Sequence, residues 1–354
     1  MGVWNFCGAV LSPGHSGPAS GTGRHRHPTR KGEAFMSGKT RVMSKAKSGS
    51  KAVKLETCVM CATDLGPASQ CAMAMAAELA EAFDARLLVV HAMELWDKRY
   101  DFLVSDLARK LKAEAEEKVS RELEHLGKTE AVPVDVLVRQ GPIVEQLIKV
   151  VIERSPLMLV IGCNSSSRPD ELHLGGMAQE LIRLSPVSVI VTRPSSSPDI
   201  KRIVCAVGAG PDSAATLKWS IDLAKRERVE EIALANTYEV PTGYLEAGMT
   251  YEIAKEKMRR LHQADVEKLI AGFAKEPVRI RAVIEEGPVA ETVARIANEE
   301  KADLLVVGSE RRTFLAALLL GRTGLQVASK AQSPVALIKS KEHRMGLLAA
   351  LERL

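Results

Sequence analysis

The sequence contains no hydrophobic run approaching the roughly 20 residues that a membrane-spanning helix requires, although 46% of its 354 residues are hydrophobic. Its first segment also lacks the apolar stretch of roughly 7 to 15 residues typical of a secretory signal. Phe6 stands where a myristoylation site has Ser or Thr. Most of the six cysteines lie in apolar segments rather than in loops suited to a disulfide framework. These absences predict a soluble protein of the reducing cytoplasm, without a membrane partner.

The sequence also lacks the common signatures of catalytic sites. It has no HExxH motif and no P-loop, and no Ser-His-Asp set or carboxylate pair can be assembled from its spacing. Cys58 and Cys61 have the spacing of a CxxC motif, but an extended strand would point them to opposite faces, so neither a metal site nor a redox site is predicted. The sequence therefore favours a protein that is not an enzyme, with no catalytic residues and no metal ligands.

One loop keeps an enzymatic alternative open. Residues 208–213 read Gly-Ala-Gly-Pro-Asp-Ser between a strand pattern and a helix pattern, but they lack the third glycine of the dinucleotide-binding motif G-x-G-x-x-G. The loop also resembles the S-G-G-x-D-S loop of ATP pyrophosphatases, with Gly208 and Ala209 replacing Ser and Gly and with Pro211 removing an N–H donor. The alternative function is thus an adenine-nucleotide-hydrolysing or ATP-pyrophosphatase-like enzyme.

Positive charge is concentrated at one end of the chain. The net charge is +5, but residues 1–54 contain ten Lys and Arg against the single acid Glu33, a local balance of +9 that leaves −4 for the remainder. Nucleic-acid binding is therefore expected only through this basic tail. Residues 1–52 are rich in Gly, Ser, Pro and His without a periodic apolar face, which predicts disorder.

A repeat with a constant offset divides most of the remaining chain into two halves. Gly162 and Gly308 are 146 residues apart, and so are Gly175 and Gly321. A Gly-Pro dipeptide at 141–142 also recurs 146 residues later, at 287–288. Such an offset, kept over about fifty residues, indicates a duplicated domain. The chain length independently allows two domains of roughly 150 residues each.

Each half shows the same alternation of strand and helix patterns. In the first half we expect strands at 57–62, 86–91, 132–138, 157–161 and 187–191, with helices at 69–83, 104–126, 142–154 and from 175. In the second half we expect strands at 203–207, 231–237, 278–284, 304–307 and 335–338, with helices from 213, at 250–273, at 288–300 and from 321. The order predicts two tandem α/β domains, each a doubly wound, Rossmann-like fold with a five-stranded parallel sheet and helices on both faces.

These patterns give the expected domain organisation. After the basic tail at 1–52, we expect domain 1 at 53–193, a linker at 194–200, domain 2 at 201–339 and a C-terminal helix at 340–354.

A glycine that ends a parallel strand and a second glycine that starts the next helix can present backbone N–H groups to a phosphate. This arrangement resembles that of the universal stress protein family, whose nucleotide-binding members have G-x2-G-x9-G-[ST] after the fourth strand and an Asp at the end of the first. The resemblance covers about 54–339 and identifies the chain as a tandem-domain universal stress protein. It implies a non-enzymatic role in the cytoplasmic stress response.

In the first domain the family motif is partly kept. Asp64 stands at the acidic position, and Gly162 and Gly175 stand at the first and third glycines, whereas Ser165 replaces the second glycine and Gly176 replaces the hydroxyl residue. The resemblance implies that these five residues form a site for ATP or AMP, with no other cofactor.

In the second domain more of the motif is lost. Gly308 and Gly321 remain, but Gly208 replaces the acid, Arg311 the second glycine and Arg322 the hydroxyl residue. The arginine side chain at the second-glycine position fills space where the family's backbone approaches the nucleotide, so the second site is expected to be degenerate.

The candidate residues also have structural interpretations. Gly162 and Gly308 could simply end strands, Gly175 and Gly321 could admit tight packing of a helix on the sheet, and Asp64 could be a turn residue.

Three further expectations concern contacts. His91 is interpreted as a core residue with its hydrogen bonds satisfied, and Arg322 is expected in an ion pair, because a cation at a helix N-terminus opposes the dipole. Family members dimerise through the last strand, and residues 187–191 and 335–338 are apolar on both faces, so we expect the two domains to pair through these strands. A homo-oligomer and an unidentified protein partner complete the expected interactions.

Overall fold

The computed structural model describes residues 57–94, 101–125, 132–163, 174–194, 196–208, 210, 212–308 and 322–339. All of these residues belong to one unit, Val53–Leu354. The predicted tail at 1–52 and the predicted C-terminal helix at 340–354 lie outside the described residues.

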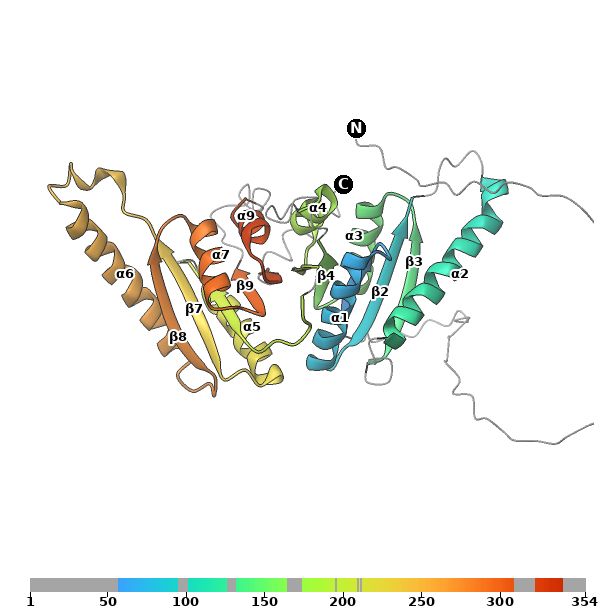
Figure 1. The fold of residues 1–354 in the computed structure, drawn as a ribbon, viewed down its shortest axis with the longest axis horizontal. Helices are drawn as coiled ribbons and strands as arrows, with labels where there is room; N and C mark the ends of the chain where they lie inside the picture. Colours follow the sequence, from blue (N-terminus) through green and yellow to red (C-terminus); the bar gives the residue numbers. More distant parts are fainter. Residues whose placement is uncertain are drawn as a thin grey trace, which may run out of the picture. The chain divides into compact units, whose positions relative to one another are not determined.

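The first half of the described chain alternates strands and helices as the sequence predicts, with boundaries that differ by up to three residues (Figure 1). Its elements are β1 (Cys58–Thr63), α1 (Pro67–Ala82), β2 (Arg86–Met93), α2 (Asp101–His125), β3 (Val134–Gln140), α3 (Ile143–Arg154), β4 (Met158–Gly162), α4 (Gly176–Leu184) and β5 (Ser188–Thr192).

The described part of the second half repeats this order and includes a short 3-10 helix before α6. Its elements are β6 (Ile203–Ala206), α5 (Asp212–Glu227), β7 (Glu231–Tyr238), η2 (Thr242–Tyr244), α6 (Tyr251–Ala271), β8 (Arg279–Glu286), α7 (Val289–Glu299), β9 (Leu304–Gly308), α9 (Arg322–Lys330) and β10 (Val335–Ile338). Among the helices that the structure describes, none is long and apolar enough to cross a membrane.

All ten of these strands form one sheet in the order β3-β2-β1-β4-β5-β10-β9-β6-β7-β8. Within each half the five strands are parallel, and their order places the first strand at the centre, as in a doubly wound fold. The predicted α/β fold class is confirmed. The carboxyl ends of β1 and β4 therefore lie next to each other.

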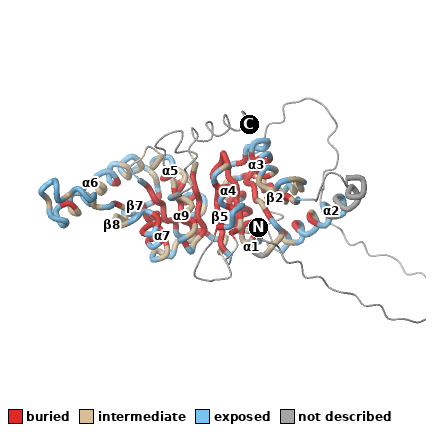
Figure 2. The backbone as a smooth tube through the Cα atoms, turned by 90° about the horizontal axis from the view of Figure 1, so that it is seen from above, coloured by how far each residue is buried: buried red, intermediate tan, exposed pale blue. Residues whose placement is uncertain are grey.

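Helices cover both faces of the sheet, and the buried residues lie along the strands and the helix faces that pack on them (Figure 2). Buried residues of α3, α4, α7 and α9 pack on one face, and those of α1, α2, α5 and α6 pack on the other. Cys58 belongs to the first cluster and Cys61 to the second, so the prediction that they point to opposite faces is confirmed. Burial raises the pKa of the Cys61 thiol to about 12, which leaves it unreactive.

The two halves are joined by antiparallel pairing of β5 with β10, as predicted. Ile190 lies opposite Ala336, its own equivalent in the repeat, while Val191 pairs with Val335 and Val189 with Leu337. The sequence repeat therefore becomes a local twofold relationship in space, and each fifth strand covers the edge of the other.

A second contact between the halves lies on the face covered by α1 and α5. The ring of Phe83, at the C-terminus of α1, stacks on that of Trp219 from α5 with 6.3 Å between centroids. Arg226 of α5 lies over the Phe83 ring at 4.8 Å and donates a hydrogen bond of 2.6 Å to the carbonyl oxygen of Ala82.

Candidate functional site

The sheet brings four of the five candidate residues of the first domain to one edge. Asp64 directly follows β1 and Gly162 ends β4, and these two strands are paired through Ala62 and Ile161. Gly175 is the N-cap residue of α4 and Gly176 is its first residue. Ligands of doubly wound sheets bind at this carboxyl edge. Ser165 lies outside the described residues.

Asp64 forms a tight turn after β1. Its Oδ1 accepts a hydrogen bond of 2.9 Å from the backbone N–H of Gly66, and the intervening Leu65 has a positive φ of 61°. The turn-residue interpretation of Asp64 is therefore correct for this oxygen. The residue is exposed, so the carboxylate is also open to solvent.

No described residue packs against the two glycines at the N-terminus of α4. Gly175 has an ordinary φ of −56° and makes no side-chain cap, and a Cβ added to Gly175 or Gly176 would meet no described atom within 4 Å. Neither the backbone conformation nor contact with a described residue requires glycine here, so the described structure gives no packing reason for Gly175. The first N–H groups of α4 have no intrahelical acceptor and are suited to bind an anion.

A buried arginine that the sequence analysis did not identify, Arg193, lies near the N-terminus of α4. The Sγ of Cys163, just after β4, accepts hydrogen bonds from the N–H of Gly175 and, at 3.4 Å, from Nη1 of Arg193. Burial raises the pKa of the Cys163 thiol, an effect that the Arg193 charge opposes, and burial lowers the pKa of Arg193. Arg193 could have been identified from the repeat. It directly follows the fifth strand of the first half, and the basic residue Lys339 stands at the same position of the second half.

The corresponding edge of the second domain differs. Gly308 ends β9, and a Cβ there would lie 2.4 Å from Oγ1 of the buried Thr216 in α5, so this glycine is required by helix-sheet packing. The strand-end interpretation of Gly308 is thus confirmed, with packing as its physical reason. Gly208 is an exposed residue after β6. Arg322 is the first residue of α9, but its side chain lies outside the described part, as do Arg311 and Gly321.

In both domains a polar side chain from the neighbouring strand bonds a carbonyl group at the carboxyl end of the central strand. The Nδ1 of His91 lies 2.9 Å from the carbonyl oxygen of Thr63, which confirms that His91 has its hydrogen bond satisfied, although it is only partly buried. In domain 2 the buried Asn236 donates to the carbonyl oxygen of Val207 at 2.8 Å, and Nδ1 of His262 lies 2.7 Å from its Oδ1. These polar groups are structural.

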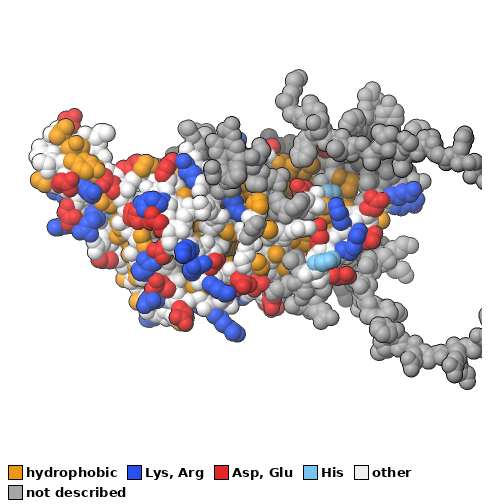
Figure 3. Space-filling view, viewed as in Figure 1, with side chains coloured by type: hydrophobic (Ala, Val, Ile, Leu, Met, Phe, Trp, Pro, Cys, Tyr) orange, Lys and Arg blue, Asp and Glu red, His pale blue; other side chains and the backbone are white. Residues whose placement is uncertain are grey.

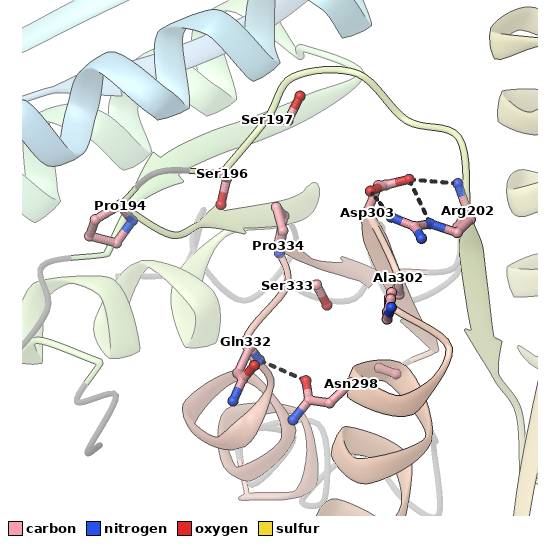
Figure 4. Close-up of a pocket in the computed structure, with 12 residues that line it drawn as sticks. Pro194, Ser196, Ser197, Arg202, Asn298, Ala302, Asp303, Gln332, Ser333 and Pro334 are labelled. Atoms are coloured by element: carbon pink, nitrogen blue, oxygen red, sulfur yellow. Dashed lines mark hydrogen bonds and ion pairs between the residues drawn. The ribbon is translucent and has the colours of Figure 1, made fainter. Parts of the chain in front are cut away.

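A cavity of about 320 Å³ lies where the linker meets the amino ends of β6, β9 and β10 (Figure 4). Asp303 accepts a hydrogen bond of 2.9 Å from the N–H of Arg202 and pairs with its guanidinium, and Oδ1 of Asn298 accepts one from the N–H of Gln332. None of the candidate residues of either domain lines it. Arg202 and Asp303, which line it, pair with each other, and the cavity is separate from the candidate residues.

The surface of domain 2 carries charges of both signs. Basic and acidic side chains lie next to each other over domain 2 (Figure 3), as in the ion pairs of Arg281 with Glu231 at 3.0 Å and Lys255 with Glu286 at 3.0 Å. Within the described ranges, no group of His, Cys, Asp and Glu is arranged to hold a metal ion. The candidate site therefore consists of the carboxyl edge of domain 1.

The model of the Universal stress protein family matches residues 58–193 and again residues 199–339. The chain belongs to the universal stress protein family. The two matches lie in tandem and correspond to the two halves of the sheet.

Three relatives illustrate how this universal stress protein compares with others. Universal stress protein Rv2623 of Mycobacterium tuberculosis is 28% identical over 189 residues, which cover 51% of this chain and 61% of the relative. Universal stress protein MJ0531 of Methanocaldococcus jannaschii is 28% identical over 139 residues, or 39% of this chain and 82% of the relative. The crystal structure of a universal stress protein from Archaeoglobus fulgidus aligns with a TM-score of 0.61 at 17% identity, covering 79% of this chain and 98% of that one. The last similarity shows the fold.

Proposed function

We propose that the first domain binds an adenine nucleotide, ATP or AMP, at its carboxyl edge, and that the protein acts without catalysis in the cytoplasmic stress response. The observation that carries this proposal is the uncovered N-terminus of α4. Gly175 and Gly176 are glycines that neither backbone strain nor contact with a described atom explains. The N–H of Gly175 donates to Cys163, and the next N–H groups at the positive end of the helix, from Gly176 onward, are suited to bind a phosphate.

The other candidate residues have distinct roles in this proposal. The N–H of Gly66 donates to Oδ1 of Asp64, and the residue is exposed. Its carboxylate would therefore accept hydrogen bonds from the ribose or base. Gly162 ends β4 beside Asp64 and would allow a close approach of the nucleotide to the backbone. Ser165 would contribute a hydroxyl from the loop between Gly162 and Gly175.

The second domain would bind nucleotide weakly, by electrostatic attraction alone. It has no acid at the position of Asp64, where Gly208 stands, and Gly308 is already used for packing against Thr216. Arg311 and Arg322 would attract phosphate without the close backbone approach that orients it. Domain 1 is therefore the proposed site and domain 2 the degenerate one.

Titration of ATP into the protein tests the proposal. We expect micromolar or weaker affinity in the wild type, and loss of binding in both Asp64→Ala and Gly175→Val, because the first removes the acceptor and the second fills the cradle. Arg322→Ala is the matched variant of the second domain and should leave binding unchanged. Undiminished binding in both domain 1 variants, or loss in Arg322→Ala alone, would move the site to domain 2.

A turnover assay separates this function from the enzymatic alternative. In the loop that resembles the ATP-pyrophosphatase motif, the hydroxyl of Ser213 donates a hydrogen bond of 2.8 Å to the carbonyl oxygen of Gly208, which ties it to the turn. We expect no ATP turnover by the chain lacking residues 1–52. Mass spectrometry of small molecules released from purified protein should identify an adenine nucleotide. We further propose that copies of the chain associate as homo-oligomers, which size-exclusion chromatography with light scattering would test.

A further inference from the structure

Lys339 of domain 2 binds the end of a domain 1 helix. Directly after β10, its Nζ donates hydrogen bonds to the carbonyl oxygen of Ile182, at 2.8 Å, and to that of Ser185. Ile182 lies in the last turn of α4 and Ser185 is its C-cap residue. The backbone N–H of Lys339 also donates to Oγ of Ser188 at 3.1 Å. The lysine therefore satisfies carbonyl groups that a helix end leaves without intrahelical donors.

The ammonium group of Lys339 has no carboxylate partner among the described residues. Helix α4 carries Glu180 and Arg183, which are both exposed, and the neighbouring Ser185 and Ser188 are uncharged. Part of the Lys339 side chain reaches solvent, but its charged end is buried, and this burial lowers its pKa to about 7. The negative end of the α4 dipole is then the counter-charge that the described structure supplies.

The helix that Lys339 holds is also the helix that begins the candidate phosphate site. Helix α4 has only nine residues, from Gly176 to Leu184, so its two ends are about 13 Å apart. Because α4 is this short, we expect a change in the anchor at Ser185 to shift the N–H groups of its first turn. A positive charge at the far end also adds to the potential that attracts an anion.

We propose that Lys339 is a positioning residue for nucleotide binding in domain 1, through which domain 2 holds the C-terminus of α4. This inference rests on the proposed nucleotide site. By linkage, a nucleotide that prefers the anchored helix binds more tightly when these hydrogen bonds are made, so removing the Lys339 donor lowers the affinity.

The first experiment is an ATP titration of four proteins in the same buffer at neutral pH. Lys339→Met should bind about fivefold or more weakly than wild type, because it removes the donor that holds α4. Lys339→Arg restores a cationic donor at this position and should bind close to wild type. Lys330→Met removes a surface lysine of domain 2 paired with Glu291 and should behave as wild type.

The second experiment needs no nucleotide. Hydrogen-deuterium exchange at a single neutral pH should be faster in α4 of Lys339→Met than in α4 of Lys339→Arg, with exchange in α7 unchanged. Equal exchange in α4 of the two variants would overturn the inference. Equal affinities of wild type and Lys339→Met for ATP would overturn it as well. Absence of binding in wild type would instead refute the proposed function, with the exchange result still deciding whether Lys339 anchors α4.

Discussion

Arg193 and Lys339 are equivalent residues of the two domains, and each binds a helix of the domain to which it does not belong. Nη2 of Arg193 donates to the carbonyl oxygen of Ala328 in α9, and Nζ of Lys339 donates to that of Ile182 in α4. The two acceptors are themselves 146 residues apart, like the two donors. The contact is therefore isologous, as in a symmetric dimer of separate chains. The domains differ in chemistry, because the guanidinium stays charged at neutral pH whereas the lysine can lose its proton.

The buried lysine should make the stability of the protein depend on pH. The pKa of Lys339 is about 7 in the folded state and near its ordinary 10.5 in the unfolded chain, so the unfolded chain binds one more proton between these values. The free energy of unfolding should therefore rise with pH in this window, by about 1.4 kcal/mol per pH unit at its centre. Urea denaturation between about pH 7 and about pH 9 measures this slope.

The comparison with Lys339→Met isolates this contribution. Burial raises the pKa values of Cys61 and Cys205 to about 12, so these thiols lower stability above their ordinary pKa of 9.0. They are present in both proteins, and their effect cancels in the difference. The variant should lack the rise that the lysine causes. Equal slopes in the two proteins would show that Lys339 titrates normally.

Phe83 and Arg226 should be energetically coupled across the two domains. The guanidinium lies 4.8 Å from the ring centroid and also binds the neighbouring carbonyl oxygen of Ala82. In a double-mutant cycle with Phe83→Leu and Arg226→Met we expect a coupling of about 0.5 to 1 kcal/mol, because Arg226 is exposed. Phe83→Leu combined with Lys330→Met, a lysine in α9, serves as the control and should give additive changes. Additivity in both cycles would contradict the coupling.

Much of this fold could be predicted from the sequence because the physical signals are local and repeated. Apolar runs such as 157–161 and 304–307 identify buried parallel strands, and the constant offset makes each half a check on the other. The pairing of β5 with β10 followed from strands that are apolar on both faces and would otherwise expose an edge.

The details of the site could not be predicted in the same way. Gly175 and Gly308 are both glycines of the motif, yet a Cβ at Gly175 would meet no described atom within 4 Å whereas one at Gly308 would be pressed against Thr216 of α5. The role of Arg193 depends on a carbonyl group of the other domain, 135 residues away in sequence. Such contacts arise from tertiary packing, for which the local pattern carries no signal.

Residues 1–52 should be dispensable for the stability of the two domains. This segment has no periodic apolar face that could pack on a core. Its deletion should leave the melting temperature nearly unchanged, as measured by differential scanning calorimetry on both proteins in the same buffer. A loss of more than about 1 kcal/mol in the free energy of unfolding would show that the segment packs on the domains.

Substitution by alanine should destabilise the protein at Gly308 but hardly change its stability at Gly175. In Gly308→Ala the new Cβ would lie 2.4 Å from Oγ1 of Thr216, a buried side chain whose hydroxyl also donates to the carbonyl oxygen of Asp212, so α5 must shift and we expect a loss of about 1 to 3 kcal/mol. Gly175→Ala meets no described atom and should change stability by less than about 0.5 kcal/mol. Denaturant unfolding gives both values, and Gly308→Ala with Thr216→Ser tests whether a smaller neighbour relieves the overlap. A neutral Gly308→Ala would mean that α5 yields freely, and an equally destabilising Gly175→Ala would mean that its glycine serves the fold rather than a ligand.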